Sequence, residues 1–155
     1  MRLWLIRHGE CDSFSSDPAG PSLTIGGLSD VEAMAVRLGG MEFRAQRLFC
    51  SPLLRARQSA VPFAALWDLA PEIADWLLPE TSAPSLLTRL QECGEKSVAL
   101  VGHMPSLGLL LAALLWGLPL REAALPRAAV AHLEVSAWEP GAGHLEWFYT
   151  PEENR

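Results

Sequence analysis

The stretch "RLWLIRHGE" (residues 2–10) decides the fold prediction, because an unbroken apolar run leads directly into charged groups. Residues 3–6 are apolar at every position, a pattern typical of a strand covered on both faces of a parallel sheet. Arg7, His8 and Glu10 follow without a spacer. These groups are tolerated if the strand ends at the surface, and they indicate a site if other strand ends bring matching groups to the same place.

Further along the chain, strands alternate with helices. "RLFCSP" (residues 47–52) and "SVALVG" (residues 97–102) are predicted to be strands, and residues 129–139 and 144–150 a final hairpin. Helices are expected between them, over residues 28–40, after residue 51, over residues 82–93 and over residues 105–118. The alternation predicts an α/β protein with a largely parallel central sheet.

Three details of the predicted helices depend on single residues. Ser29 with Glu32 fits a capping box at the start of the first helix. Ser51 is expected to cap a helix that begins at Pro52, and Pro62 is expected to kink or divide that helix, because proline cannot donate a backbone hydrogen bond.

Length and composition narrow the function classes. A chain of 155 residues, of which 50% are hydrophobic and 19% charged, predicts a single globular domain over residues 1–155. The net charge of −6 and the lack of a basic run disfavour nucleic acid or an anionic membrane as partner. No apolar stretch is long enough for a signal peptide or a membrane span, so we expect a cytoplasmic protein.

Three predicted strands end in polar motifs. The first ends in Arg7-His8-Gly9-Glu10, the second in "SPLLRARQS" (residues 51–59) and the third in "GHMPS" (residues 102–106), which contains His103. Sites in open α/β sheets form beyond the carboxyl ends of the strands, so these motifs are expected to converge. Arg55 and Arg57 lie about 200° apart around a helix, so only one of them can face the site, and the spacing does not choose between them.

The converging side chains suit a phosphoryl group better than a metal ion. Two histidines flanked by arginines make a poor metal site, and the three cysteines lack metal-ligand spacing. Guanidinium groups can hold phosphate oxygens with paired hydrogen bonds, one neutral histidine can attack phosphorus, and the other can donate to an oxygen. The sequence therefore predicts phosphoryl-transfer chemistry that needs no metal and no cofactor.

The motifs "RHGE", "SPLLRARQSA" and "VGHMPSL", in this order on successive strand ends, resemble those of the histidine phosphatase superfamily. The short length and "SLTIGG" (residues 22–27) are most similar to the SixA-type phosphohistidine phosphatases. The resemblance implies a three-layer α/β/α sandwich of the phosphoglycerate mutase-like fold. It implies that His8 is the nucleophile and that Arg7, Arg55 and His103 bind the phosphoryl group. It also implies that Gly9 lets a backbone carbonyl fix the tautomer of His8.

The proton donor is the open question. Glu80, in "LLPETSAP" (residues 77–84), is the best candidate by order along the chain, and Glu10 is its rival because it lies beside His8. An alkoxide leaving group needs a proton, whereas imidazole, with an unperturbed pKa of about 6.5, needs far less help. A weak acid therefore favours a phosphohistidine substrate.

We accordingly expect a phosphatase that acts on a His-phosphorylated signalling protein. The alternatives are a phosphatase of small monoesters, such as sugar or nucleotide-related phosphates, and a catalytically weak phosphate-dependent regulatory module. His132 and His144 are expected to be structural and far from the motif-bearing strands, and Arg57 to be a solvated or salt-bridged helix residue.

Overall fold

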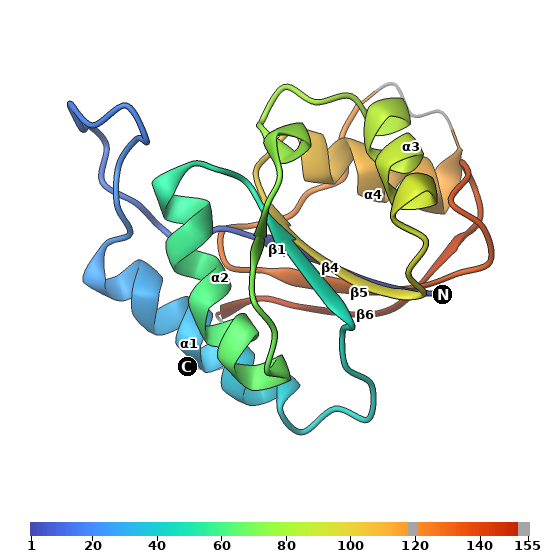
Figure 1. Cartoon of the computed structure of the whole chain (residues 1–155), viewed down its shortest axis with the longest axis horizontal. Coiled ribbons are helices and arrows are strands. Elements are labelled where there is room, and N and C mark those ends of the chain that lie inside the picture. Colours follow the sequence, from blue (N-terminus) through green and yellow to red (C-terminus); the bar gives the residue numbers. More distant parts are fainter. Residues whose placement is uncertain (118–120, 152–155) are drawn as a thin grey trace.

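The strands of the central sheet lie in the order β3-β2-β4-β1-β5-β6 in the computed structural model, which describes residues 1–117 and 121–151. Two pairs of helices enclose this sheet, with α1 and α2 on one face and α3 and α4 on the other (Figure 1). The strands are β1 (Arg2–Arg7), β2 (Arg47–Cys50), β3 (Glu72–Ile73), β4 (Ser97–Gly102), β5 (Val130–Val135) and β6 (Gly143–Tyr149). The helices are α1 (Ile25–Leu38), α2 (Leu54–Trp67), α3 (Ala83–Cys93), α4 (Ser106–Trp116) and a short 3₁₀ helix η1 (Asp75–Leu77). The predicted three-layer α/β/α sandwich is confirmed.

The pairing of the strands places the motif-bearing ends together. β4 runs parallel to β1 on one side and to β2 on the other, with Arg7 opposite Gly102 and Cys50 opposite Val101. β5 and β6 complete the sheet as an antiparallel hairpin next to β1. Because β1, β2 and β4 are adjacent and parallel, their carboxyl ends reach the same edge of the sheet.

The apolar run in β1 explains how the layers hold together. Leu3 and Leu5 pack into a core shared with α3 and α4, whereas Trp4 and Ile6 pack into a second core shared with α1 and α2. All four side chains are at most 1% exposed. Successive side chains of a strand point to opposite faces, so a strand between two helix layers must be apolar at every position.

The first helix begins earlier than its capping box predicted. α1 starts at Ile25, and Thr24 is its N-cap, because the Thr24 hydroxyl accepts a hydrogen bond from the Gly27 N–H at 2.9 Å. The prediction that Ser29 caps this helix is therefore wrong. Gly26 and Gly27 are weak helix formers, and they hid the first turn in the sequence.

Pro62 does not divide the second helix, so that part of the prediction is wrong, and a kink at Pro62 stays a prediction. α2 runs from Leu54 to Trp67 with Pro62 inside it. Phe63 and Trp67, beyond the proline, are buried in the core on that face of the sheet, so tertiary packing holds the second half of the helix in place.

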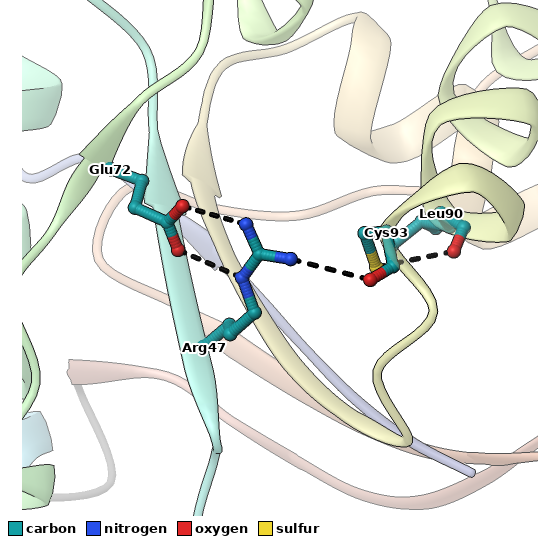
Figure 2. Close-up of polar contacts among 4 residues, drawn as sticks. All are labelled: Arg47, Glu72, Leu90 and Cys93. Carbon is teal, nitrogen blue, oxygen red and sulfur yellow. Dashed lines mark hydrogen bonds and ion pairs between the residues drawn. The ribbon is translucent and has the colours of Figure 1, made fainter.

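Residues 72–77 form elements too short to leave a periodic signal. Figure 2 shows how Arg47 of β2 holds β3: its Nε and Nη2 donate to the two carboxylate oxygens of Glu72 at 2.9 and 2.6 Å. The third nitrogen, Nη1, donates to the carbonyl of Cys93 at the end of α3, at 3.3 Å. These bonds lower the pKa of Glu72 and tie the edge strand to the helix layer.

Among the described residues, no helix combines the length and the apolar character that crossing a membrane requires.

Candidate active site

His8 lies where β1 ends. Its N–H donates to the Gly102 carbonyl and its carbonyl accepts from the Ala128 N–H, both at 3.0 Å, so the backbone is held between β4 and the segment that leads into β5. The side chain is only 5% exposed. The ring Nδ1 lies 2.7 Å from the Gly9 carbonyl oxygen, which can only accept, so the proton is on Nδ1. Nε2 is left with a free lone pair, and the predicted role of a backbone carbonyl in fixing this tautomer is confirmed.

Gly9 is required by a close approach. A Cβ atom at this position would lie 2.7 Å from the carbonyl oxygen of Gly27 in α1, which is closer than real side chains allow. The Gly9 N–H donates to Ser59 Oγ at 3.0 Å, and that hydroxyl donates to the Arg55 carbonyl at 2.7 Å. The strand end is thereby fixed to both α1 and α2.

His103, directly after β4, offers the opposite chemistry to His8. Its Nε2 lies 2.7 Å from Ser51 Oγ, which also accepts a hydrogen bond from the Leu53 N–H at 3.2 Å. Among the described residues, Nε2 is the acceptor in reach of the Ser51 hydroxyl proton, so we assign that proton to the bond with Nε2 and the ring proton to Nδ1. Nδ1 is buried and has no hydrogen-bond partner within residues 1–117 and 121–151. The ring therefore presents an unused N–H donor.

The two imidazoles lie side by side, as the convergence of strand ends predicted. Their ring centroids are 5.1 Å apart, with an angle of 55° between the planes. Burial and the neighbouring arginine charges lower the pKa of His8 to about 4. Burial, followed by the charge of His8 and then two arginines, lowers the pKa of His103 to about 3. Both rings are consequently neutral at pH 7, one as a base and one as a donor.

The two arginines of α2 differ in their relation to the imidazoles. The charge of Arg55 acts on both imidazoles, whereas Arg57 is exposed. The Arg55 side chain contacts the loop over residues 12–22: a Cβ added at Gly20 would lie 3.1 Å from Arg55 Nη1. Arg7 is half-buried, and its Nη1 donates to the Leu125 carbonyl at 3.1 Å. Burial and the charge of Arg127 lower the pKa of Arg7.

The sequence pattern of the histidine phosphatase superfamily (branch 1) matches residues 3–82, which include two of the three strand-end motifs. The chain belongs to the histidine phosphatase superfamily. The resemblance inferred from the motifs is confirmed.

Similar proteins and structures support this placement. The phosphohistidine phosphatase SixA of Escherichia coli K12 is 28% identical over 158 residues, covering 97% of this chain and 94% of that protein. An uncharacterised Picosynechococcus protein is 33% identical over 116 residues, covering 70% of this chain and 69% of that one. A structure of the protein histidine phosphatase SixA complexed with tungstate has a TM-score of 0.88 at 25% identity, over 100% of both chains.

A mycobacterial glucosyl-3-phosphoglycerate phosphatase shares the fold, with a TM-score of 0.73 at 19% identity over 94% of this chain and 96% of that chain. The chain is thus a phosphatase of the histidine-phosphatase type, with a SixA-like, phosphoglycerate mutase-like fold.

The two candidate acids of this histidine phosphatase lie outside the pair of imidazoles. Glu80 is exposed and lies in the turn after η1, three residues beyond Leu77. Leu77 itself is close to the end of β4, because a Cβ added at Gly102 would lie 3.5 Å from the Leu77 carbonyl oxygen. That turn therefore flanks the end of β4. The carboxylate of Glu10 accepts a hydrogen bond from the Thr24 hydroxyl at 3.1 Å. Neither carboxylate is among the charges that shift the pKa of the two histidines, and the identity of the acid stays a prediction.

Three polar residues of the site were missed in the sequence. Ser51 and Ser59 stand inside the "SPLLRARQS" motif, but nothing in the spacing showed that their hydroxyls bond to His103 and Gly9. Arg127 is exposed in a segment that carries no motif, yet its charge acts on His8. The available signal in the sequence was its position two residues before a predicted strand. In the structure that strand, β5, pairs with β1, which carries His8 at its end.

The other two histidines differ from each other. His144 is exposed. His132 is buried and structural, as predicted, and stacks on Trp4 with ring centroids 4.4 Å apart. The expectation that it lies far from the motif-bearing strands is wrong, because β5 pairs directly with β1.

Proposed function

We propose that this chain is a metal-independent protein phosphohistidine phosphatase that works through a phosphorylated His8. The observation that carries the proposal is the complementary pair of buried imidazoles: Nε2 of His8 is a free nucleophile, and Nδ1–H of His103 is a free donor 5.1 Å away by ring centroids. We treat residues 1–155 as one catalytic domain.

In the first step, His8 Nε2 attacks phosphorus and the bond from phosphorus to the substrate nitrogen breaks. The substrate imidazole leaves as a neutral ring when its second nitrogen carries a proton, so the enzyme need not supply one. In the second step, water attacks phosphorus, His8 regains its lone pair, and the proton of the water leaves with inorganic phosphate. The Nδ1–H bond to Gly9 persists throughout and keeps Nε2 aligned.

Charge in this cycle is stabilised by groups of the chain itself. Arg7 and Arg55 supply positive charge beside both imidazoles, and His103 Nδ1–H is placed to donate to a phosphoryl oxygen. Within residues 1–117 and 121–151, no three His, Cys, Asp or Glu side chains gather closely enough to hold a metal ion. Metal independence is supported by the arginine charges that surround the imidazoles.

The substrate class follows from the leaving group. Glu80 is exposed, Glu10 is hydrogen-bonded to Thr24, and no carboxylate is among the charges that shift the pKa of either imidazole, so we assign neither acid the protonation of an alkoxide. Imidazole leaves without that help. The name of the Escherichia coli relative, a phosphohistidine phosphatase, points the same way. We therefore assign a His-phosphorylated signalling protein in the cytoplasm as partner.

The decisive experiment compares a phosphohistidine-bearing transfer domain with a panel of phosphate monoesters. Wild-type enzyme should hydrolyse the phosphohistidine and trap labelled phosphate on His8, with or without a chelator. His8→Ala should lose at least about a thousandfold in turnover while staying folded, because the nucleophile is gone. His144→Ala, on an exposed histidine, is the matched control and should retain full activity.

The panel also separates the alternatives. Glu80→Gln should leave phosphohistidine turnover unchanged, and a loss confined to esters identifies Glu80 as an acid for those substrates. Rapid turnover of esters alone would overturn the substrate assignment. Failure of any donor to label His8 would favour a regulatory module that binds phosphate without efficient catalysis.

A further inference from the structure

The segment that leads into β5 forms an additional wall beside His8. Ala128 is fully buried and has a φ of 60°, a left-handed conformation that residues other than glycine rarely adopt. Its N–H donates to the His8 carbonyl at 3.0 Å, and the Ala129 N–H closes a tight turn onto the Pro126 carbonyl, also at 3.0 Å. The Arg7 N–H donates to the Ala129 carbonyl at 3.1 Å. Surrounding contacts therefore impose the turn despite its unfavourable backbone geometry.

This turn places Arg127 at the mouth of the site. Ala128, which follows Arg127, is hydrogen-bonded to the His8 backbone. Leu125, two residues before Arg127, accepts a hydrogen bond from Arg7 Nη1 at its carbonyl, at 3.1 Å. Arg127 is exposed, whereas His8 is buried. Its charge nevertheless reaches both Arg7 and His8.

Within residues 1–117 and 121–151, no carboxylate neutralises the charge of Arg127. Ion pairs to carboxylates engage Arg2, Arg47 and Arg89, and among the described residues none is found between Arg127 and an acidic side chain. Three guanidinium groups then act on one imidazole in a chain whose net charge is −6. Like charges repel in a partly buried site, and a bound dianion is the group that relieves this repulsion.

We propose that Arg127 is a third phosphoryl-binding arginine, which closes over the solvent side of the phosphoryl group while Arg7 and Arg55 hold it from within. The inference rests on the proposed function for the place of the phosphoryl group beside His8. Because Arg127 contacts the group equally before and during transfer, it contributes uniform binding. Its loss raises KM and leaves kcat nearly unchanged.

The first test measures binding without turnover. Inorganic phosphate is titrated calorimetrically into wild type, Arg127→Gln and Arg121→Gln, with Arg121 as an exposed arginine of the same connecting segment. Loss of a charge-assisted hydrogen bond should weaken phosphate binding about tenfold in Arg127→Gln. Arg121→Gln should bind phosphate as wild type does. A Kd for Arg127→Gln within twofold of wild type overturns the inference.

The second test uses phosphohistidine hydrolysis. Arg127→Gln should raise KM about tenfold with kcat within threefold of wild type, and Arg127→Lys should recover part of the loss. A fall in kcat at unchanged KM would contradict uniform binding. If His8 cannot be labelled but phosphate binding still weakens in Arg127→Gln, the proposed function fails and this inference stands. If His8 is labelled and phosphate binding is unchanged, only this inference fails.

Discussion

At the scale of single residues, one hydroxyl group determines what His103 can do. The Ser51 oxygen accepts a hydrogen bond from the Leu53 N–H, and among the described residues Nε2 of His103 is the acceptor in reach of the Ser51 hydroxyl proton. We assign the ring proton to Nδ1, the nitrogen that no described residue contacts through a hydrogen bond, because this leaves the Ser51 hydroxyl with an acceptor. A serine that need not touch the substrate therefore decides whether the histidine donates or accepts at the phosphoryl group.

Replacing Ser51 by Ala should lower kcat/KM about ten- to a hundredfold, because the donor tautomer of His103 is no longer selected by a buried hydrogen bond. Ser106→Ala is the matched control, since the Ser106 hydroxyl bonds to the His103 carbonyl and not to its ring. Nitrogen-15 chemical shifts of the His103 ring report the tautomer directly. A ring that keeps its proton on Nδ1 in the Ser51 variant would show that another group sets the tautomer.

At the scale of elements, the contact between α1 and the end of β1 is unusually close. A Cβ at Gly27 would overlap the Glu10 carbonyl oxygen, and one at Gly9 would lie 2.7 Å from the Gly27 carbonyl oxygen. The Thr24 N–H also donates to the Glu10 carbonyl at 3.0 Å. Two glycines thus let a helix pack directly on the backbone that carries the nucleophile.

Gly27→Ala should destabilise the fold by about 1–3 kcal/mol, because the methyl group overpacks rigid backbone. Residues 9 and 10 must shift with it, so kcat/KM should also fall. Gly26→Ala is the control: the nearest atom to its Cβ is Thr24 Oγ1 at 3.9 Å, and alanine should stabilise the helix by roughly 0.5–1 kcal/mol. Urea denaturation and steady-state kinetics measure both effects, and equal stabilities for the two variants would contradict the close packing.

At the scale of the whole molecule, the fold buries three neutral histidines. His8 and His103 lie in the site, and His132 lies under the α1 side of the sheet. Burial is the largest cause that lowers the pKa of each, to about 4, about 3 and about 4 respectively. In the unfolded chain the histidine pKa values are near 6.5, so between about pH 6.5 and pH 4 the unfolded chain binds more protons than the folded chain.

The free energy of unfolding should therefore be greatest above pH 6.5 and should fall as the pH drops from about 6.5 toward 4. Each of these histidines lowers the free energy of unfolding by roughly 2 kcal/mol between pH 7 and pH 5. Urea titrations at several pH values give the slope. His132→Gln should reduce this slope by about a third, and His144→Gln, at an exposed site, should leave it unchanged. A stability that is flat between pH 7 and pH 5 would contradict neutral burial.

The local sequence determined the parts of the fold that local chemistry controls. The run before Arg7 and His8 is apolar at every position, which predicts a central strand buried on both faces. The run before His103 predicts the same. Ser82 and Gly94 bound α3 as cap and stop, because capping depends on the nearest few residues. From the order of such strand ends, the convergence of the two histidines was predictable.

Tertiary structure alone decided what depends on contacts between distant segments. Residue spacing left Arg55 and Arg57 equivalent, and only the family resemblance favoured Arg55. The bond from Ser51 to His103 and the position of Arg127 require knowing which elements are neighbours. The uninterrupted course of α2 through Pro62 is likewise imposed by packing beyond the proline. A hydrogen bond or a charge in a shared pocket acts through space over a few ångströms, and sequence spacing records no such distance.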